Sequence, residues 1–487
     1  MTPPLILFFD HPHADPTAAR ALVGGKGASL WRMARLGLPV PPGFTIAVPV
    51  AARLAAGDTA DDATFDAAFE AALDAALDRL QALAGRRLGD CDDPLLVSVR
   101  SGAAESMPGM MDTVLNLGAV ADWATKSDFA ADCRARFERQ FAALVSPALL
   151  AAPPREQLAA AIRAVAASWG SARARAYRDR MGIGHAGGTA VTVQAMVFGN
   201  RDSQSATGVA FSRCPTTGIA GPVGDLLWQA QGEDVVAGLC TPEPLGRLAK
   251  RLPQAALALA HAIAVLETEW RDLVDVEFTI ESGQLWILQA RAGKRSATAA
   301  ARIAVELTRD PAIRLDRAEA LARIGPQRDA LPVMTRGAGA AALAQGLPAA
   351  PGLASGALVI TPDAALERAD AGQAVVLVRA ETSPEDVHGM AVAAGIITAI
   401  GGPMSHAALV AREFGLPAVV GCSAVRLGDG GAWIGERWCA EGTIISLDGA
   451  TGEIFWGKIA GAAVEDPFAA ELRRWAAEAA IGERATP

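Results

Sequence analysis

The sequence contains 487 residues, of which 51% are hydrophobic and 20% are charged. At roughly 100–200 residues per domain, this length predicts about three or four folding units, each able to bury a core. The formal net charge is −9 at pH 7. An acidic surface repels the phosphates of nucleic acids and anionic lipids, so neither is expected as a partner. An anionic substrate would therefore need a local cluster of cations.

The N-terminal segment lacks a basic region, and its apolar stretch is too short for a secretory signal. No apolar run approaches the roughly 20 residues that a membrane-spanning helix needs. The six cysteines are scattered, and no pair of them has the spacing of a metal site. These features predict a cytoplasmic protein with free thiols.

The N-terminal region alternates predicted strands and helices. Residues 5–9 are consistently apolar and predict a buried strand. The glycine-rich segment 23–30 follows, and we expect it to open a helix that stops at Gly37. Residues 60–85 repeat apolar side chains at helical spacing, and the apolar run 95–100 predicts a further strand.

A helical segment precedes a second set of predicted strands. Phe129, Cys133, Phe137 and Phe141 recur every four residues, so a helix would place them on one face. The predicted strands that follow are residues 189–198, 206–213, 273–280 and 284–290. The residues between the last two strands, Glu281-Ser-Gly-Gln284, have the composition of a hairpin turn.

The composition changes again toward the C-terminus. Residues 337–351 are rich in Gly, Ala and Pro, which predicts a linker. Short strands and helices alternate beyond it, as in a small α/β domain. We therefore expect an N-terminal subdomain, a helical insert, a C-terminal subdomain, a linker, a small swivelling domain and a terminal helix with tail. Their predicted bounds are 1–118, 119–185, 186–336, 337–351, 352–465 and 466–487.

His406 is the most informative residue of the small domain. The predicted strand 395–400 ends in Gly401-Gly402, and Ser405 is a suitable N-cap for a helix that runs to Phe414. His406 would lie in the first turn of this helix. There the helix dipole would lower the pKa of the imidazole and stabilise a phosphate bonded to it. On spacing alone, a histidine that only caps a helix explains the pattern equally well.

Two strings around His406, ETSPEDVHGM and GGPMSHAALVAREFGLPAVVG, resemble the phosphohistidine domain of the PEP-utilising enzymes. The family motif is GG-x-TSHA. Its serine and histidine are present as Ser405 and His406, whereas Met404 replaces its threonine. By this resemblance, His406 is the phosphoryl carrier.

Further strings resemble pyruvate phosphate dikinase in order along the chain. They include GGKGASL, LLVSVRSGAAESMPGMMDTVLNLG, GTAVTVQAMVFGN and DVEFTIESGQLWILQARAGKR. The resemblance implies a multidomain protein of mixed α/β and α+β class. An ATP-grasp nucleotide-binding domain with a helical insert would be followed by a small swivelling phosphohistidine β/α domain.

The resemblance also implies cations for the phosphates of ATP. Lys26 lies in a glycine-rich loop at a predicted helix start, where backbone N–H groups assist phosphate binding. Arg100 ends an apolar strand, and a phosphate partner would explain its position. Arg213 lies in the segment Ser212-Arg-Cys-Pro215, which resembles a T-R-N-P loop close to the ATP phosphates in the family. An exposed lysine and ordinary ion pairs remain alternative explanations.

The predicted hairpin at residues 273–290 arranges four polar residues in pairs. Because side chains alternate, Asp275 and Glu277 share one face of a strand, and Gln289 and Arg291 share one face of the next. The resemblance implies that Glu277 and Gln289 bind Mg²⁺ through oxygen, Arg291 contacts the transferred phosphate and Asp275 orients a ligand. A solvated face of an edge hairpin is the alternative.

The implied reaction phosphorylates His406 at the expense of ATP, with Arg100 and Arg291 assisting, and it uses inorganic phosphate and releases AMP and pyrophosphate. About 80 residues follow His406. This is fewer than the roughly 250 residues of a PEP/pyruvate barrel, so we expect the acceptor site on a separate subunit.

Two alternatives stay open. One is a dikinase-like component that serves a non-pyruvate acceptor, such as a phenolic hydroxyl. The other is a regulatory relic that binds nucleotide without transfer. The sequence leaves open whether the chain forms a homo-oligomer.

Overall fold

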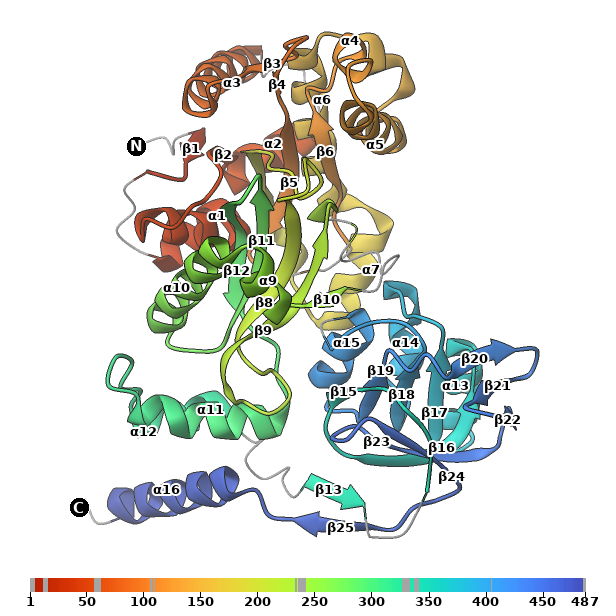
Figure 1. The fold of residues 1–487 in the computed structure, drawn as a ribbon. Coiled ribbons are helices and arrows are strands. Elements are labelled where there is room, and N and C mark those ends of the chain that lie inside the picture. The colour runs from red at the N-terminus through yellow and green to blue at the C-terminus, as the bar shows by residue number, and fades with distance from the viewer. Residues whose placement is uncertain are drawn as a thin grey trace. The chain divides into compact units, whose positions relative to one another are not determined.

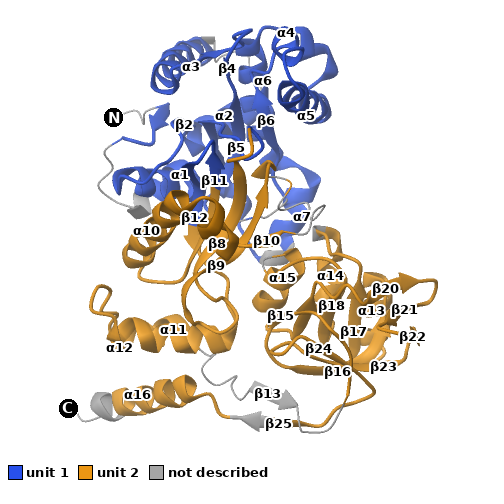
Figure 2. Cartoon of the chain, viewed as in Figure 1, with its two compact units in different colours: residues 1–201, 279–290 blue, residues 202–278, 291–487 orange. Residues whose placement is uncertain are grey.

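The structure is a computed structural model. It describes residues 5–11, 16–56, 63–105, 107, 110–232, 234, 242–325, 333–336, 341–403 and 405–484. The chain forms two compact units, coloured separately in Figure 2. They comprise residues 1–201 with 279–290, and residues 202–278 with 291–487. Because the division runs through a β-hairpin, each unit is built from two stretches of the chain.

The first unit is built on a five-stranded antiparallel sheet (Figure 1). In spatial order its strands are β1 (Ile6–Phe8), β2 (Gly43–Ile46), β7 (Thr189–Ala195), β5 (Val97–Ala103) and β6 (Thr113–Leu117). Every residue of β2 and β7 is buried, so side chains on both faces of the sheet are covered. The strands expected at 5–9, 95–100 and 189–198 are confirmed, with slightly different ends.

Helices supply most of the remaining core of this unit. They are α1 (Pro16–Arg35), α2 (Val48–Ala56), α3 (Ala63–Ala84), α4 (Ala121–Ala124), α5 (Asp128–Leu144), α6 (Pro154–Ala167) and α7 (Ala172–Met181). The helical character expected for 119–185 is therefore confirmed. Cys133, Phe137 and Phe141 are fully buried on α5, so the four-residue repeat does face the core.

The helix predicted at the glycine-rich segment begins earlier than expected. α1 starts at Pro16 and contains a kink at Gly24, where φ is +70° and ψ is 175°. This conformation is almost restricted to glycine, because a side chain would clash with the backbone. A short helix thus precedes the glycine-rich segment, and the kink redirects the chain before Lys26.

The second unit contains a five-stranded sheet ordered β10-β9-β8-β11-β12. Its strands are β10 (Glu243–Pro244), β9 (Ala220–Trp228), β8 (Ala206–Arg213), β11 (Val274–Glu281) and β12 (Gln284–Ala292). The predicted hairpin is confirmed, since Ser282 and Gly283 both have positive φ, as a tight two-residue turn requires. Neither β9 nor the long helix α10 (Pro253–Trp270) was predicted from the sequence.

A second sheet of this unit carries the His406 region. Four neighbouring strands run parallel: β16 (Leu353–Val359), β17 (Val375–Arg379), β18 (Gly395–Thr398) and β19 (Ala418–Val420). β23 (Ile444–Asp448) and β24 (Glu453–Trp456) extend the sheet on one side. Helices α13 (Pro362–Asp370), α14 (Val387–Met390) and α15 (His406–Phe414) connect the parallel strands.

The predicted linker is partly wrong. Residues 337–340 lie outside the described residues, but β14 (Ala342–Gln345) and β15 (Leu347–Ala350) occupy most of the remainder. These two strands pair with β24 and β19 at opposite edges of the eight-stranded sheet. The small residues that suggest a loop are ordered here by backbone hydrogen bonds to partners distant in sequence.

Two further features connect the ends of this sheet to the rest of the second unit. β13 (Val333–Arg336) precedes it and pairs antiparallel with β25 (Gly461–Val464), which follows it. The terminal helix α16 (Pro467–Arg484) runs beside α11 (Ala297–Arg309), and both contribute to one buried cluster (Figure 1). None of the helices that the structure describes combines the length and apolar character needed to cross a bilayer.

Gly24 and Gly37 offer a matched test of the kink in α1. Both have φ near +70°, but a Cβ on Gly24 would lie 1.7 Å from the Gly102 carbonyl oxygen, whereas a Cβ on Gly37 meets nothing within 4 Å. Gly37→Ala should cost only the backbone strain of about 1–2 kcal/mol. Gly24→Ala should lower the thermal unfolding midpoint of the first unit considerably more. Calorimetry measures both variants, and equal shifts would show that the close approach is not a constraint.

Candidate active site

The glycine-rich segment of α1 packs against the end of β5. Besides the approach of Gly24 to Gly102, a Cβ on Gly102 would lie 3.4 Å from the Cβ of Lys26. Arg100, two residues before Gly102, directs its Nε–H to the Ser98 hydroxyl at 3.1 Å. The structure thus brings together the two elements that carry Lys26 and Arg100, which the sequence assigned to phosphate binding from separate motifs.

Buried Asp275 forms an ion pair with the partly exposed Arg291 across the β11–β12 hairpin. Arg291 Nε donates to Asp275 Oδ2 at 2.7 Å, and the Asp275 residue is only 3% exposed. Burial raises the pKa of Asp275, while the positive charge of Arg291 opposes this shift. The other oxygen, Oδ1, has no hydrogen-bond partner and retains its capacity to accept. Asp275 and Arg291, which the sequence placed on neighbouring strands of the predicted hairpin, therefore contact each other.

Glu277 and Gln289 follow the alternation expected of the same hairpin. Glu277 lies two residues after Asp275, and Gln289 lies two residues before Arg291, so each shares a strand face with a member of the ion pair. Both side chains are partly exposed. Their assignment as Mg²⁺ ligands stays a prediction.

Arg213 has carboxylate partners that the sequence did not suggest. Its Nε donates to Glu267 at 2.8 Å, and its Nη1 donates to Glu306 at 2.6 Å. The Arg213 side chain is only 5% exposed. The two carboxylates therefore compensate the charge of a guanidinium that has lost most of its contact with water. A phosphate contact by Arg213 would require exchange of one of these partners, and that role also stays a prediction.

His406 is the first residue of α15, as the sequence predicts. Ser405 occupies the N-cap position, and Gly415 ends the helix with φ of +69°. The Ser405 hydroxyl, however, makes no capping hydrogen bond and is buried without a partner. Met404, which replaces the threonine of the family motif, lies outside the described residues.

Two neighbours define the state of the His406 ring. The hydroxyl of Thr382 lies 3.0 Å from Nδ1. Burial lowers the pKa of His406 below its ordinary value, and the negative charge of Asp386 partly opposes that shift. The predicted direction is therefore confirmed, but its principal cause is burial. A pKa lowered below 6.5 favours the neutral ring at pH 7, and Nδ1 is the nitrogen that contacts Thr382.

Thr382 and Asp386 are site residues that sequence reasoning missed. Both lie in the string ETSPEDVHGM, where Asp386 accepts from the Ser383 backbone N–H at 2.8 Å within a capping box. Thr382 immediately precedes this box. Its position in the string ETSPEDVHGM was the available signal, but the distance to His406 depends on the packing of β17 beside β18.

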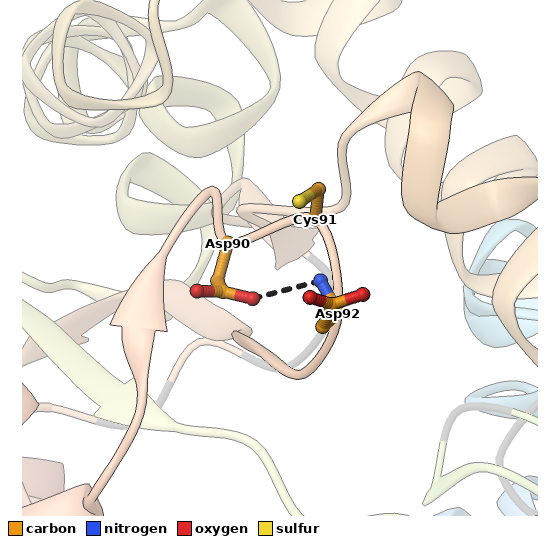
Figure 3. A group of neighbouring side chains, drawn as sticks. All are labelled: Asp90, Cys91 and Asp92. Carbon is orange, nitrogen blue, oxygen red and sulfur yellow. Dashed lines mark hydrogen bonds between the residues drawn. The ribbon is translucent and has the colours of Figure 1, made fainter.

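One group of potential metal ligands lies elsewhere, in the turn between β3 (Arg87–Leu88) and β4 (Pro94–Leu95) (Figure 3). It consists of Asp90, Cys91 and Asp92. Asp90 Oδ1 accepts from the Asp92 backbone N–H at 2.7 Å, and Asp92 pairs with Lys126. These contacts explain the cluster as a turn, and nothing in it points to a bound ion.

Comparison with known proteins identifies two regions. Residues 54–257 match the family described as pyruvate phosphate dikinase, AMP/ATP-binding domain. Residues 371–452 match the PEP-utilising enzyme, mobile domain, and this range includes Thr382 and His406.

Similar curated proteins are pyruvate phosphate dikinases of bacteria and plants. The chain is 39% identical to the pyruvate, phosphate dikinase of Rhizobium meliloti over 90% of its own length and 56% of the relative. The Clostridium symbiosum protein is 39% identical over 90% of this chain and 57% of the relative. For pyruvate, phosphate dikinase 2 of Oryza sativa, the identity is 40%, over 90% and 55%. The chain thus spans about half the length of these relatives.

The two matched regions and the similarity over nine-tenths of the chain agree with each other. The chain is a relative of the pyruvate phosphate dikinases and carries sequence of both their AMP/ATP-binding domain and the mobile domain of the PEP-utilising enzymes.

Proposed function

We propose that this chain is a dikinase-like phosphotransferase in which His406 accepts a phosphoryl group from ATP and passes it to a second acceptor. One observation carries the proposal: His406 stands at the start of α15 with Nδ1 at 3.0 Å from the Thr382 hydroxyl and with its pKa lowered by burial. A neutral, oriented imidazole is a competent nucleophile at neutral pH.

The chemistry at His406 follows from this arrangement. When Nδ1 carries the proton and donates a hydrogen bond to Thr382, the lone pair is on Nε2. Nε2 would attack the β-phosphorus of ATP as the bond to AMP breaks, and the γ-phosphoryl group would then pass to inorganic phosphate and leave as pyrophosphate. The first N–H groups of a helix lack intrahelical partners and favour an anion near them. The N-terminus of α15 would therefore stabilise the negative charge of the phosphorylated ring. In the dikinase reaction, inorganic phosphate is used and AMP and pyrophosphate are released.

Five residues are proposed to bind the nucleotide. Lys26 and Arg100 would contact phosphate oxygens, since the glycines around them allow the backbone to approach closely. Arg291 would stabilise the transferred group, and Asp275 holds Arg291 in place. Arg213 would contribute only after exchanging a carboxylate for phosphate.

The residues of the hairpin fit a magnesium ion. Glu277 and Gln289 offer the oxygen donors that Mg²⁺ prefers, and Asp275 Oδ1 retains an unfilled acceptor. Mg²⁺ bound with ATP would neutralise part of the phosphate charge. Glu277 and Gln289 would hold it.

The final acceptor is proposed to bind outside the two matched regions, as a PEP/pyruvate-binding domain on a partner subunit. The relatives are much longer than the segment they share with this chain.

The function is tested by incubating the chain with Mg²⁺, inorganic phosphate and ATP labelled on the β- or γ-phosphate. With the label on the β-phosphate, we expect acid-labile, base-stable label on the protein together with AMP, and none on His406→Ala. With the label on the γ-phosphate, it should leave in pyrophosphate. His388, which lies on α14 and pairs with Asp363 at 3.3 Å, provides the matched control, because His388→Ala should label normally. Absence of label on the wild-type protein with and without phosphate would contradict the proposal.

Thr382 allows a test of ring orientation. Thr382→Val removes the hydroxyl near Nδ1 with little change of shape, whereas Thr382→Ser retains it. We expect Thr382→Val to slow labelling by ~10–100-fold, because misorientation of a reacting group has costs of this size. Thr382→Ser should remain within a few-fold of wild type. Rapid-quench labelling measures both rates, and equal rates in the two variants would remove Thr382 from the mechanism.

The pH dependence of labelling reports the His406 ring. Only the neutral ring is nucleophilic, and burial lowers its pKa below 6.5. The rate should therefore stay high at pH 6.5 and decline at lower pH. Since Asp386 raises this pKa, Asp386→Asn should move the inflection to still lower pH. The wild type and Asp386→Asn are compared at the same ATP concentrations. The protonation of ATP at low pH then affects both rates equally. An inflection that moves upward in Asp386→Asn would contradict this account.

A further inference from the structure

Arg412 is a buried cation on the helix that begins with His406. The residue is 3% exposed, and burial lowers its pKa to about 10. Its Nη1 donates to two carbonyl oxygens, those of Ala349 at 3.0 Å and Pro403 at 2.8 Å. Its Nε and Nη2 have no hydrogen-bond partner. A guanidinium in this position carries a large desolvation cost that only nearby negative charge offsets.

One nitrogen of Arg412 holds the segment that delivers His406. Pro403 lies in the short loop between β18 and α15, three residues before His406. Ala349 belongs to the edge strand β15, which pairs with β19. The guanidinium therefore ties the loop before His406 to the sheet of the mobile domain. A shift of Arg412 would shift the start of α15.

The remaining charge of Arg412 is balanced from outside the mobile domain. The negative charge of Asp275 favours the charged form of Arg412, and Arg412 in turn opposes the rise in the Asp275 pKa that burial causes. Asp275 uses Oδ2 for Arg291 and leaves Oδ1 unbonded, just as Arg412 leaves Nε and Nη2 unbonded. Complementary hydrogen-bonding capacity is thus present on two buried, oppositely charged neighbours within the second unit.

Three further contacts link residues near Arg412 to other parts of the second unit. The Thr216 hydroxyl donates to the Ala349 carbonyl at 3.1 Å, the same oxygen that accepts from Arg412. Lys294, just after β12, pairs with Glu413 at 2.7 Å. Leu409 packs against a buried cluster that includes residues of β8 and α11. Among the charged residues of these contacts, Arg412 is buried, whereas Lys294 and Glu413 form an exposed pair.

We propose that Arg412 is a positioning residue, which couples the seating of α15 beside Asp275 to the alignment of His406 for phosphoryl transfer. The inference rests on the function proposed above. With α15 seated, Asp275 neutralises the guanidinium, and the guanidinium fixes the Pro403 carbonyl. Separation of α15 from these strands would hydrate Arg412 and remove the charge that holds it. The loop before His406 would then lose its anchor.

The test compares Arg412→Met, Arg412→Lys and the control Glu413→Ala in the full chain. We expect Arg412→Met to slow single-turnover labelling of His406 by roughly 10²-fold, the cost of a small misplacement of a reacting group. Arg412→Lys should also be slower, since an ammonium cannot span the carbonyls and Asp275 together. Nucleotide affinity should be unchanged, and Glu413→Ala should stay near the wild-type rate because it removes only an exposed pair.

Hydrogen exchange provides a second readout that does not depend on activity. Arg412→Met should increase exchange in peptides from the β18–α15 loop and from β8, while peptides of β20 (Val425–Gly428) to β22 (Arg437–Ala440) remain protected. If the wild-type chain forms no phosphohistidine, the proposed function fails. The hydrogen-exchange comparison alone then decides whether Arg412 couples the seating of α15 to the loop before His406. Wild-type labelling in Arg412→Met, unchanged exchange, or loss of nucleotide binding would overturn the proposal. If Arg412→Met does not fold, Arg412→Lys replaces it under the same criteria.

Discussion

The carboxylate of Asp275 is almost completely removed from water, and a charge in that position requires a cation. Arg291 meets this requirement at 2.7 Å from the neighbouring strand. Removal of one partner from such a pair typically costs about 3–5 kcal/mol, because the other charge stays buried. The pair therefore constrains the register of the β11–β12 hairpin. That hairpin in turn positions Glu277 and Gln289. Asp275 also interacts electrostatically with Arg412.

The His406 ring depends on a different balance. Burial makes protonation unfavourable, and Asp386 moderates this effect without reversing it. Thr382 contacts Nδ1 from the segment after β17, so segments that follow two neighbouring parallel strands of one sheet bring the hydroxyl and the imidazole together. Glycines at 401 and 402 make the loop compact: a Cβ on Gly401 would lie 3.0 Å from the Ser405 hydroxyl. Small residues and burial here serve reactivity as well as packing.

Much of this arrangement is encoded locally and was predictable. The hairpin turn, the helix that starts at His406 and the buried face of α5 follow from periodicity, capping and turn chemistry, which depend on neighbours in the sequence. The ordered strands β14 and β15 were not predictable, because their hydrogen-bond partners lie far along the chain. The carboxylates around Arg213 and the threonine beside His406 belong to the same class. These contacts form only when elements distant in the sequence pack together, and the local sequence does not predict that packing.

The pairing of β13 with β25 has a consequence for how the mobile domain is attached. Chain enters the domain through one strand and leaves it through the other, and the two are joined by backbone hydrogen bonds over four residue pairs. A two-stranded ribbon resists bending within its plane more than a single flexible chain does, while it twists readily. If the domain moves about this two-stranded ribbon, it would rotate around a defined axis, and its distance from that axis would change little. The His406 helix would then travel on an arc whose radius is set by this two-stranded ribbon.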